Sequence, residues 1–469
     1  MVMGSLTEET ELAVIGGGPG GYVAAMRAAD LGREVVLIEQ REQPGGVCLL
    51  EGCIPSKTLI HAVDLIQQAA AAEQLGLRFG APQIDLERLR GFTAETVSGL
   101  SDGIRLLLER RGVELLRGRA RLTGPGELAI AGGAVAGVRF RQALLATGSR
   151  PRPLELAGEL PLWSSADALA LPRVPEQLLV IGGGYIGIEL GLVYAGLGAR
   201  VSLVEQAPRL LAGADADLVD VMLRSVDQRL DALRFETRVL GLERSQAGVA
   251  VTVEQAGRRE TLEADQVLVA VGRLPNSDDL GLEKVGLEPA GDGRLAVDAA
   301  GRTAAEGIWA VGDITPGPML AHKASREAKV AAAVISRHSA AFDNRSIPAV
   351  VYTDPEIAWA GLTEHEAEQR GIPVRIGRFP LRALGRARTL GRSDGLTKVI
   401  ARPEDGLVLG VGMVGPNASE LIAEGSLALE MGATLEDLLV TIHPHPTLSE
   451  SVMEAAEVAA EQPIHVLPR

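Results

Sequence analysis

The order of apolar and polar positions follows one long pattern that occurs twice in the chain. Residues 12–39 read LAVIGGGPGGYVAAMRAADLGREVVLIE, and residues 178–205 read LLVIGGGYIGIELGLVYAGLGARVSLVE. The offset is 166 from residue 12 to residue 178 and again from residue 39 to residue 205. In each copy an apolar run, a glycine-rich turn, a stretch of helical periodicity and a second apolar run follow one another. The pattern predicts two β-strand–helix–β-strand units, each opening a parallel sheet.

Three glycines in each copy have the spacing G-x-G-x-x-G. They are Gly16, Gly18 and Gly21 in the first copy, and Gly182, Gly184 and Gly187 in the second. The first glycine permits a tight turn, the second lets the backbone approach a pyrophosphate, and the third lets the helix pack closely on the strand. The N–H groups and the positive dipole at the helix N-terminus attract the phosphates. Because both copies are in register with a strand and a helix, we predict two dinucleotide sites.

An acidic residue ends the second apolar run of each copy, Glu39 in the first and Glu205 in the second. A carboxylate at this position accepts hydrogen bonds from a ribose diol. An NADP site places an arginine beside the acid, whereas here the nearest one, Arg209, is four residues on. Since flavin and nicotinamide are commonly coupled in hydride transfer, the pair of units predicts FAD and, at the second unit, NAD.

Composition narrows the class of protein. The 61 acidic and 46 basic residues leave a net charge of −15, which disfavours a nucleic-acid partner, and 3% aromatic residues leave few side chains for base stacking. No run of 18 apolar residues occurs and the N-terminus has no apolar leader segment, so we expect neither a membrane span nor a signal peptide. At 469 residues the chain is expected to form about three domains in the cytoplasm.

The chain has only two cysteines, Cys48 and Cys53, within GGVCLLEGCIPSK. Two are too few for a disulfide-stapled secreted fold or a cysteine-rich zinc site. In a continuous helix their Cα atoms would lie roughly 8.6 Å apart, beyond the reach of about 7 Å that a disulfide allows. A bond between them therefore requires a break in the helix, which the neighbouring glycines permit. The residues favour a redox-active disulfide, with two buried free thiols as the alternative.

Two histidines, His443 and His445, lie between prolines in TIHPHPTLSE, and Glu450 ends this segment. Imidazole is the natural base for a thiol near neutral pH, and a carboxylate fixes its tautomer and orientation. A surface His-Pro loop is an equally good interpretation of the spacing alone. A metal site is disfavoured because no cluster of acidic or thiol ligands accompanies the histidines.

These motifs, in this order, resemble the dihydrolipoamide dehydrogenases, which act as E3 in 2-oxo-acid dehydrogenase complexes and belong to the class I pyridine nucleotide-disulfide oxidoreductases. The resemblance covers nearly the whole chain. Its most specific matches are GCIPSK at 52–57, GGGYIGIELG at 182–191, WAVGDI at 309–314, MLAHKA at 319–324 and HPTLSE at 445–450. The resemblance implies an oxidoreductase that converts protein-bound dihydrolipoamide to lipoamide through a Cys48–Cys53 disulfide and FAD and reduces NAD to NADH.

The resemblance also implies roles for the catalytic residues. Cys48 would exchange with the substrate, and Cys53 would lie against the flavin. Lys57 and Glu189 resemble the ion pair beside flavin N5. His445 would be the base and Glu450 the residue that orients it, both supplied by the other subunit of a homodimer.

Further residues are implied in cofactor binding. Asp313 matches the acid that binds the FAD ribityl chain, Ala321 lies in the flavin-contacting segment that follows, and Tyr185 matches the gate over the nicotinamide. Additional cofactor-binding positions are predicted at Lys57, Gly118, Gly148, Val239 and Gly272.

The implied partner is a lipoylated carrier: the E2 component of a 2-oxo-acid complex, the glycine cleavage H protein or a lipoate-binding protein. The segment around the two cysteines, residues 45–57, is called the redox loop. It departs from the commonest family pattern at Val47, Leu50 and Glu51, and these departures leave open its redox potential and the carrier that it serves. Glutathione-type reductases usually read GCVPKK and prefer NADP, so Glu205 and the IPSK of residues 54–57 argue against them. Two alternatives stay open: a flavin reductase of another disulfide, and a redox-linked binding subunit of a lipoyl-carrier system.

The expected fold is α/β, with two Rossmann-like dinucleotide-binding domains and a C-terminal α+β dimerisation domain. By the resemblance, residues 1–151 bind FAD, 152–272 bind NAD, 273–342 return to the FAD domain, and 343–469 form the dimer interface. Residues 88–110 are predicted to form an amphipathic helix on the flavin domain. His322 is expected to begin a helix and to be a packing or flavin-side residue rather than a ligand.

Overall fold

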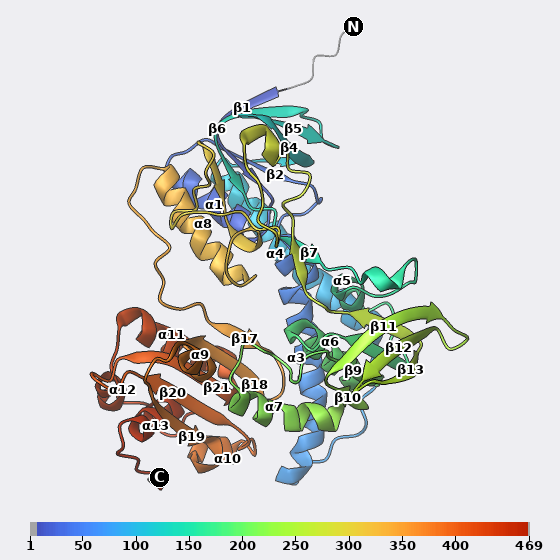
Figure 1. Ribbon diagram of the computed structural model, residues 1–469, viewed down its shortest axis with the longest axis vertical. Coiled ribbons are helices and arrows are strands. Elements are labelled where there is room, and N and C mark those ends of the chain that lie inside the picture. Colours follow the sequence, from blue (N-terminus) through green and yellow to red (C-terminus); the bar gives the residue numbers. More distant parts are fainter. Residues whose placement is uncertain (1–6, 468–469) are drawn as a thin grey trace. The chain divides into compact units, whose positions relative to one another are not determined.

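The computed structural model describes residues 7–467, and the chain divides into two compact units, each of which is described by itself. The first unit contains the described residues up to Thr58 together with Asp85–Arg152 and Gly272–Asp343. The second contains Leu59–Ile84, Pro153–Val271 and the described residues from Asn344 onward. Each unit is therefore assembled from segments that are far apart in the sequence (Figure 1).

A seven-stranded sheet forms the centre of the first unit. Its order is β3–β2–β1–β6–β5–β4, and β16 also pairs with β6. The strands are β1 (Thr7–Ile15), β2 (Val35–Glu39), β3 (Glu114–Arg117), β4 (Arg119–Gly124), β5 (Glu127–Ala131), β6 (Gly137–Leu145) and β16 (Ile308–Ala310). The pairs that involve β1, β2, β3 and β16 are parallel, whereas β4 and β5 add antiparallel pairs. The last four residues of β1 are all buried because both faces of the sheet are covered.

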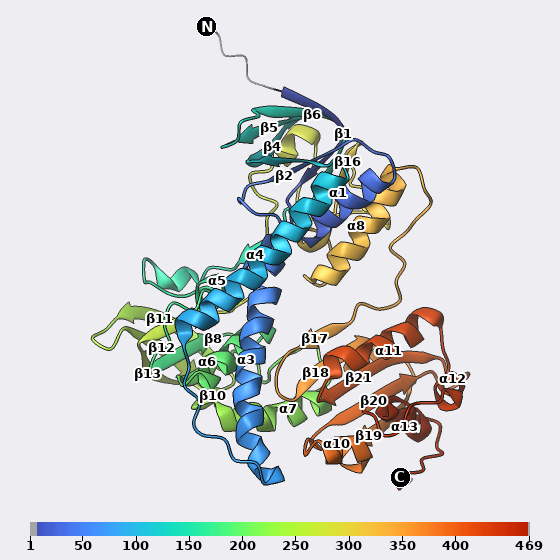
Figure 2. The same cartoon turned by 180° about the vertical axis from the view of Figure 1, so that it is seen from behind.

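Three long helices of the first unit share one hydrophobic core with the sheet (Figure 2). They are α1 (Pro19–Asp30), α4 (Leu86–Arg110) and α8 (Ala321–Ile335). The core joins side chains such as Leu37 and Leu144 of the sheet to Ala24, Leu108 and Ala328 of the helices. Helix α4 confirms the amphipathic helix predicted at residues 88–110. Few of its residues are buried, and two of these, Ile104 and Leu108, pack in the core.

Short elements complete this unit. They are α2 (Gly46–Glu51), β7 (Ser149–Pro151), β15 (Arg273–Pro275), η3 (Leu282–Val285) and η4 (Gly312–Ile314). Strands β7 and β15 form a separate antiparallel pair. Helix α3 (Cys53–Ala71) begins in the first unit and ends in the second, where η1 (Ala72–Leu75) follows it.

The first part of the second unit is built on a parallel sheet of order β10–β9–β8–β14. Its strands are β8 (Gln177–Ile181), β9 (Arg200–Val204), β10 (Ala232–Arg234) and β14 (Gln266–Val269). The helices are η2 (Glu155–Ala157), α5 (Ser165–Leu169), α6 (Tyr185–Gly196) and α7 (Ala216–Arg229). Residues 187–194 of α6 are all buried, as expected for a helix that is apolar on every side.

Two antiparallel sheets complete the second unit. The smaller contains β11 (Thr237–Arg244), β12 (Val249–Gln255) and β13 (Arg258–Ala264). The larger has the order β17–β18–β21–β20–β19, with β17 (Ala349–Val351), β18 (Glu356–Gly361), β19 (Arg375–Pro380), β20 (Leu396–Ala401) and β21 (Val408–Gly415). Its helices are α9 (Glu364–Arg370), η5 (Leu381–Ala383), α10 (Gly385–Thr389), α11 (Ala418–Met431), α12 (Leu435–Val440) and α13 (Glu450–Ala459). Phe379 and Met413 of this sheet share one core with Ile422 of α11 and Val452 of α13.

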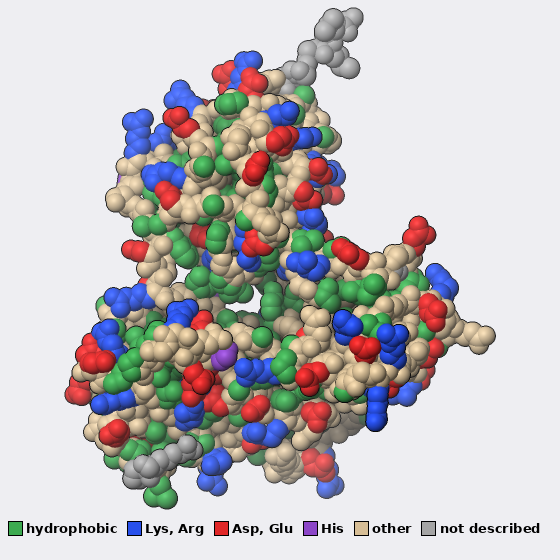
Figure 3. Space-filling view, viewed as in Figure 1, with side chains coloured by type: hydrophobic (Ala, Val, Ile, Leu, Met, Phe, Trp, Pro, Cys, Tyr) green, Lys and Arg blue, Asp and Glu red, His purple; other side chains and the backbone are tan. Residues whose placement is uncertain are grey.

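The strand registers reproduce the sequence repeat. Leu12 pairs with Val35 in the first unit, and Leu178 pairs with Val201 in the second, each position shifted by the same 166 residues. The expected α/β class, with two Rossmann-like units and a C-terminal α+β part, is confirmed. Acidic and basic side chains are interspersed over the visible face of both units (Figure 3). Among the helices of residues 7–467, none is long and apolar enough to cross a membrane.

Candidate active site

The first glycine turn has the geometry that the motif predicts. Gly16 has a φ of +103°, and a Cβ there would lie 2.4 Å from the carbonyl oxygen of Ala146. A Cβ at Gly21 would lie 1.7 Å from the carbonyl oxygen of Gly16, so only glycine lets α1 approach β1 this closely. Gly18 precedes α1 in an extended conformation, and no side chain caps the helix. The first N–H groups of α1 are therefore well placed for a phosphate.

The second turn repeats this geometry. Gly182 has a φ of +112°, and a Cβ there would lie 2.4 Å from the carbonyl oxygen of Ala270. A Cβ at Gly187 would lie 2.0 Å from the carbonyl oxygen of Gly182. Gly184 precedes α6, which also has no side-chain cap. The two turns therefore suit the same kind of ligand, a dinucleotide pyrophosphate.

The acid that ends β2 is held by the backbone. Glu39 is 7% exposed, and its Oε2 accepts a hydrogen bond of 2.7 Å from the amide of Gly17. Its Oε1 accepts one of 2.9 Å from the amide of Arg41. A carboxylate has about four acceptor positions, so both oxygens retain capacity for ribose hydroxyls.

The acid that ends β9 is held in the same way. Oε2 of Glu205 accepts from the amide of Gly183 at 2.6 Å, and Oε1 accepts from the amide of Ala207 at 2.7 Å. A carboxylate fixed at this position would repel the 2′-phosphate of NADP. The geometry therefore agrees with a preference for NAD.

Two further predicted positions lie beyond the carboxyl ends of strands in the first unit. Gly118 follows β3, has a φ of +148° and donates its amide to the carbonyl oxygen of Glu39 at 2.9 Å. The carbonyl oxygen of Gly148 accepts from the amide of Asn276 at 2.9 Å. Ligands of open α/β sheets bind at this edge, so both positions suit a cofactor-binding role.

Asp313 in η4 is oriented by residues that the sequence did not single out. Its Oδ2 accepts a hydrogen bond of 2.5 Å from the hydroxyl of Ser149. Arg273 donates to the same hydroxyl oxygen at 2.7 Å and to the Ser149 carbonyl oxygen at 2.7 Å. The Arg273–Ser149 contact thus sets the direction of the carboxylate that is predicted to bind the ribityl chain.

A buried ion pair also contacts the turn that contains Asp313. Lys323 is 3% exposed, and its Nζ donates to the carbonyl oxygen of Gly312 at 3.0 Å and to the hydroxyl of Thr315 at 2.9 Å. Glu327 lies 2.9 Å from this ammonium and accepts the Gly312 amide at 2.7 Å. The predicted residue Ala321 begins α8 directly before this pair. His322 is exposed at the start of the helix.

The two cysteines form a disulfide. Helix α2 ends at Glu51, Gly52 interrupts the helical backbone, and α3 begins at Cys53. The Cα atoms of Cys48 and Cys53 are 4.7 Å apart, well below the separation in a continuous helix. A Cβ at Gly52 would lie 2.9 Å from the carbonyl oxygen of Val47, which explains why glycine occupies the break. The disulfide prediction is confirmed, and the alternative of two free thiols is wrong.

The unusual Glu51 of the redox loop has a partner that sequence patterns could not indicate. Nη2 of Arg41 lies 2.8 Å from Oε2 of Glu51. Leu50 packs at the edge of the core formed by α1 and α4. Two of the three departures, Leu50 and Glu51, are therefore accommodated by contacts within the first unit.

His445 and Glu450 form the dyad that the C-terminal motif predicted. Nδ1 of His445 lies 2.8 Å from Oε1 of Glu450, the first residue of α13. Oε2 of Glu450 accepts the amide of Thr447 at 2.8 Å. Because Nδ1 donates to the carboxylate, Nε2 carries the lone pair that can accept a proton. The His445 side chain is 77% exposed, so a substrate thiol can reach it.

The charge state of Glu450 favours this arrangement. Burial alone would raise the pKa of Glu450, but hydrogen bonds from the Thr447 amide and from His445 oppose it. Electrostatic interactions with His445 and His443 act in the same direction as these hydrogen bonds, so the pKa of Glu450 lies below its ordinary value. A carboxylate that stays ionised keeps the imidazole in one tautomer and stabilises its protonated form.

The remaining predicted residues are placed on separate elements. Lys57 lies one turn after Cys53 on α3, and Glu189 lies on α6 and is 3% exposed. Tyr185 is the first residue of α6 and 39% exposed. Val239 lies on β11, and the carbonyl oxygen of Gly272 accepts the amide of Arg152 at 2.9 Å. The Lys57–Glu189 ion pair stays a prediction.

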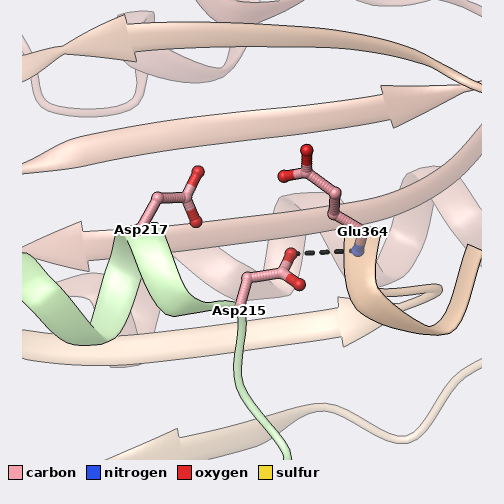
Figure 4. A group of neighbouring side chains, drawn as sticks. All are labelled: Asp215, Asp217 and Glu364. Carbon is pink, nitrogen blue, oxygen red and sulfur yellow. Dashed lines mark hydrogen bonds between the residues drawn. The ribbon is translucent and has the colours of Figure 1, made fainter. Parts of the chain in front are cut away.

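Within the described residues, Asp215, Asp217 and Glu364 bring carboxylates together in a way that would suit a metal ion (Figure 4). The fully buried Lys398 occupies this position instead. Its Nζ lies 2.8 Å from Asp215, 2.6 Å from Asp217 and 3.0 Å from Glu364. Arg378 pairs with Asp217 and Glu364 as well. The cluster is therefore an ion-pair network that joins α7, α9 and β20.

Comparisons with known proteins agree with this geometry. Residues 10–328 match the family described as pyridine nucleotide-disulphide oxidoreductase, and residues 347–456 match the dimerisation domain of that family. The chain is 44% identical to a dihydrolipoyl dehydrogenase of Geobacillus stearothermophilus, over 100% of both chains. It is 46% identical to a dihydrolipoyl dehydrogenase of Thermus scotoductus, over 98% of this chain and 99% of the relative. The crystal structure of LpdA from Mycobacterium tuberculosis superposes with a TM-score of 0.88 at 32% identity, over 96% of this chain and 99% of LpdA.

Proposed function

The chain belongs to the pyridine nucleotide-disulphide oxidoreductase family, and from this premise we propose that it oxidises protein-bound dihydrolipoamide to lipoamide and reduces NAD to NADH. The observation that carries the function is the Cys48–Cys53 disulfide across the break between α2 and α3. It lies within a chain whose full-length relatives are dihydrolipoyl dehydrogenases. A dithiol substrate and a neighbouring disulfide exchange without any further oxidant.

The protein uses FAD and NAD as its cofactors. We propose that the first glycine turn, Glu39 and Asp313 hold FAD, and that the second turn and Glu205 hold NAD. Gly118, Gly148 and Ala321 are proposed to line the FAD site, and Tyr185, Val239 and Gly272 the NAD site. Held by these residues, FAD would supply the acceptor for the electron pair of the reduced cysteines, and NAD would supply the final hydride acceptor. The paired backbone donors on Glu39 and on Glu205 support these assignments.

The residues of the chain carry the thiol exchange. Nε2 of His445 takes the proton of one substrate thiol, and the resulting thiolate attacks Sγ of Cys48. The Cys48–Cys53 bond breaks, a mixed disulfide forms, and Cys53 leaves as a thiolate. The second substrate thiol then attacks the mixed disulfide, so that lipoamide leaves and Cys48 becomes a thiol. Two electrons have moved from the substrate to the cysteine pair, and Glu450 stabilises the protonated His445 meanwhile.

We propose that the enzyme works as a homodimer in which each disulfide meets His445 of the partner subunit. The match of residues 347–456 to a dimerisation domain supports the dimer. The 77% exposure of His445 within one chain supports a role at a surface that another chain can approach.

The substrate's lipoyl group is proposed to come from a lipoylated carrier: an E2 component, an H protein or a lipoate-binding protein. The assignment of residues 1–151 and 273–342 to FAD, 152–272 to NAD and 343–469 to dimerisation is proposed likewise, with Lys57 and Glu189 paired beside the flavin. The cytoplasmic location expected from the sequence stays a prediction.

The direct test is an assay of the FAD-loaded protein. Dihydrolipoamide and NAD should yield NADH, whereas reduced glutathione with NADP should yield little product. Activity with glutathione and none with dihydrolipoamide would show that the enzyme serves another disulfide. Tight binding to a lipoylated carrier with only weak turnover would favour a binding subunit instead.

A further inference from the structure

His443 has surroundings that the mechanism above does not use. It lies in residues 441–449, between α12 and α13, two positions before His445. Much of this segment is exposed, yet the side chain of His443 is only 5% exposed. An ordinary surface His-Pro loop would leave the ring in solvent, so the burial of this ring needs a separate explanation.

Both ring nitrogens of His443 face oxygen atoms. Nδ1 lies 3.0 Å from the carbonyl oxygen of Thr441, and Nε2 lies 2.7 Å from Oε1 of Glu424 on α11. The Thr441 carbonyl belongs to the loop itself, whereas Glu424 belongs to α11. The ring therefore links the loop to that helix through its contact with the Glu424 carboxylate.

The loop that contains the catalytic base is thus held from two sides. On one side, Glu450 of α13 binds His445 at 2.8 Å and the Thr447 amide at 2.8 Å. On the other side, His443 connects the loop to Glu424 of α11. The charged groups that interact with His443 are Glu424 from α11, which contacts the ring, and Glu450 from α13, which has an electrostatic interaction with it.

We propose that His443 is a positioning residue for thiol exchange: its ion pair with Glu424 holds residues 441–449 so that Nε2 of His445 faces the incoming thiol. This inference rests on the function proposed above. Without the pair, His445 keeps its bond to Glu450, but the loop loses its connection to α11. A displacement of about 1 Å at a catalytic group can lower a rate about 100-fold, so the loss of this contact should be measurable.

The test compares two substitutions of His443 in the FAD-loaded protein. His443→Gln retains a donor at the place of Nε2, whereas His443→Ala removes both contacts. The rate at which dihydrolipoamide reduces the enzyme is measured by stopped flow, and NADH-driven reduction of an artificial dye is measured separately. We expect His443→Ala to slow reduction by dihydrolipoamide about ten-fold or more, His443→Gln to recover part of that loss, and dye reduction to stay within about two-fold of wild type.

Glu424→Gln gives a second variant that approaches the pair from α11, where the side chain is 29% exposed. It should also slow reduction by dihydrolipoamide, because an amide offers a neutral and weaker contact. His465→Ala is the matched control, since His465 forms a separate pair with Glu454 at 2.5 Å; it should behave as wild type.

Wild-type rates in both His443→Ala and Glu424→Gln would overturn the inference, as would an equal loss in both half-reactions, which indicates general damage to the fold. If the wild-type protein itself is not reduced by dihydrolipoamide, the proposed function is wrong. The two failures are therefore distinguishable.

Discussion

The backbone amide of Tyr352 donates a hydrogen bond of 3.0 Å to Oε1 of Glu189. Glu189 is buried on α6, the helix that follows the second glycine turn. Tyr352 directly follows β17 of the larger antiparallel sheet. Burial raises the pKa of the Tyr352 hydroxyl, and the negative charges of Glu356, Glu189 and Glu420 add to the effect. The carboxylate that is predicted to pair with Lys57 is therefore oriented in part by the backbone of the C-terminal sheet.

Two substitutions of Glu189 should separate its charge from this hydrogen bond. Glu189→Gln keeps an oxygen for the Tyr352 amide, so the free energy of unfolding should change by less than about 1 kcal/mol, while reduction of the flavin by NADH slows. Glu189→Ala leaves the partly buried N–H of Tyr352 without that acceptor and should lower the free energy of unfolding by about 1–3 kcal/mol. Denaturant unfolding and rapid-reaction kinetics measure the two effects. Equal destabilisation in both variants would contradict the separation.

Cys53→Ser should retain bound FAD and yet form no NADH from dihydrolipoamide. Without Cys53 no disulfide exists for the substrate to reduce, whereas the contacts of Asp313 with Ser149 do not involve the cysteine. Flavin absorbance and the rate of NADH formation are the measurements, and Cys48→Ser serves as the companion variant. Turnover of dihydrolipoamide at the wild-type rate in either variant would show that the disulfide is not the redox group.

His445→Gln should slow reduction by dihydrolipoamide by about 100-fold or more, as expected for the loss of a general base, with little effect on FAD or NAD binding. Stopped-flow reduction and ligand titrations check both parts. Unchanged turnover would remove His445 as the base.

The pH dependence of the dyad follows from Glu450. Burial opposes the effect, but the hydrogen bonds from Thr447 and His445 leave the pKa of Glu450 below its ordinary value of about 4.3. A carboxylate with a depressed folded pKa contributes stability above its unfolded pKa and loses it as pH falls through the folded one. Glu450 should therefore add no acid limb to the pH–rate profile above about pH 5. An acid limb in that range that disappears in Glu450→Gln would contradict this prediction.

Glu39→Ala and Glu205→Ala form a matched pair that tests the two dinucleotide sites. Hydrogen bonds to a charged group are worth about 1.5–3 kcal/mol, so Glu205→Ala should weaken NAD binding by about 10- to 100-fold and leave FAD in place. Glu39→Ala should weaken FAD binding instead. Titration of the apoprotein with FAD and of the loaded protein with NAD measures both affinities. The opposite pattern would reverse the assignment of the two turns.

Lys398→Met should destabilise the protein strongly, because three carboxylates would lose their buried ammonium. Removal of one partner from a buried ion-pair network costs about 3–5 kcal/mol. The exposed Lys329, changed to Met, is the control and should leave the melting temperature nearly unchanged. Thermal and denaturant unfolding of the two variants provide the comparison. Similar stability in both would show that the cluster contributes little.

The stability that the carboxylates around Lys398 contribute should also depend on pH. Burial would raise the pKa of Asp217, but hydrogen bonds from Lys398 and Arg378 lower it below the ordinary value. Its stabilising effect in the wild type is thus present above about pH 4 and lost as pH falls further. In Lys398→Met the uncompensated carboxylates favour protonation, so the deficit relative to wild type should shrink between about pH 7 and pH 5. A constant deficit would argue against a charge effect.

Local sequence was enough to predict the features that depend on neighbouring residues. The two strand–turn–helix units require glycine at particular positions because Gly16 and Gly182 adopt positive φ values against a neighbouring carbonyl. The break between Cys48 and Cys53 and the His445–Glu450 dyad also span only five residues each, so spacing alone constrains them. Short-range geometry therefore makes these elements predictable from the order of the amino acids.

Partners from distant segments were not predictable in this way. Ser149 meets Asp313 across 164 residues, and Glu189 meets Tyr352 across 163. Arg41 meets Glu51, and His443 meets Glu424, without any periodic signal that connects them. Polar contacts of this kind follow no period along the chain, whereas apolar burial repeats with the period of the helix or strand.

The physical reason is that a glycine turn, a helix break and a short dyad are set by backbone geometry over a few residues, which the local sequence specifies. Other features depend on which segments the packed sheets bring together. They include the direction of the Asp313 carboxylate, the partner of the His443 ring and the cation that lies among the carboxylates around Lys398. Only the tertiary structure determines these partners, because a buried charge is stable only where folding brings a partner to it.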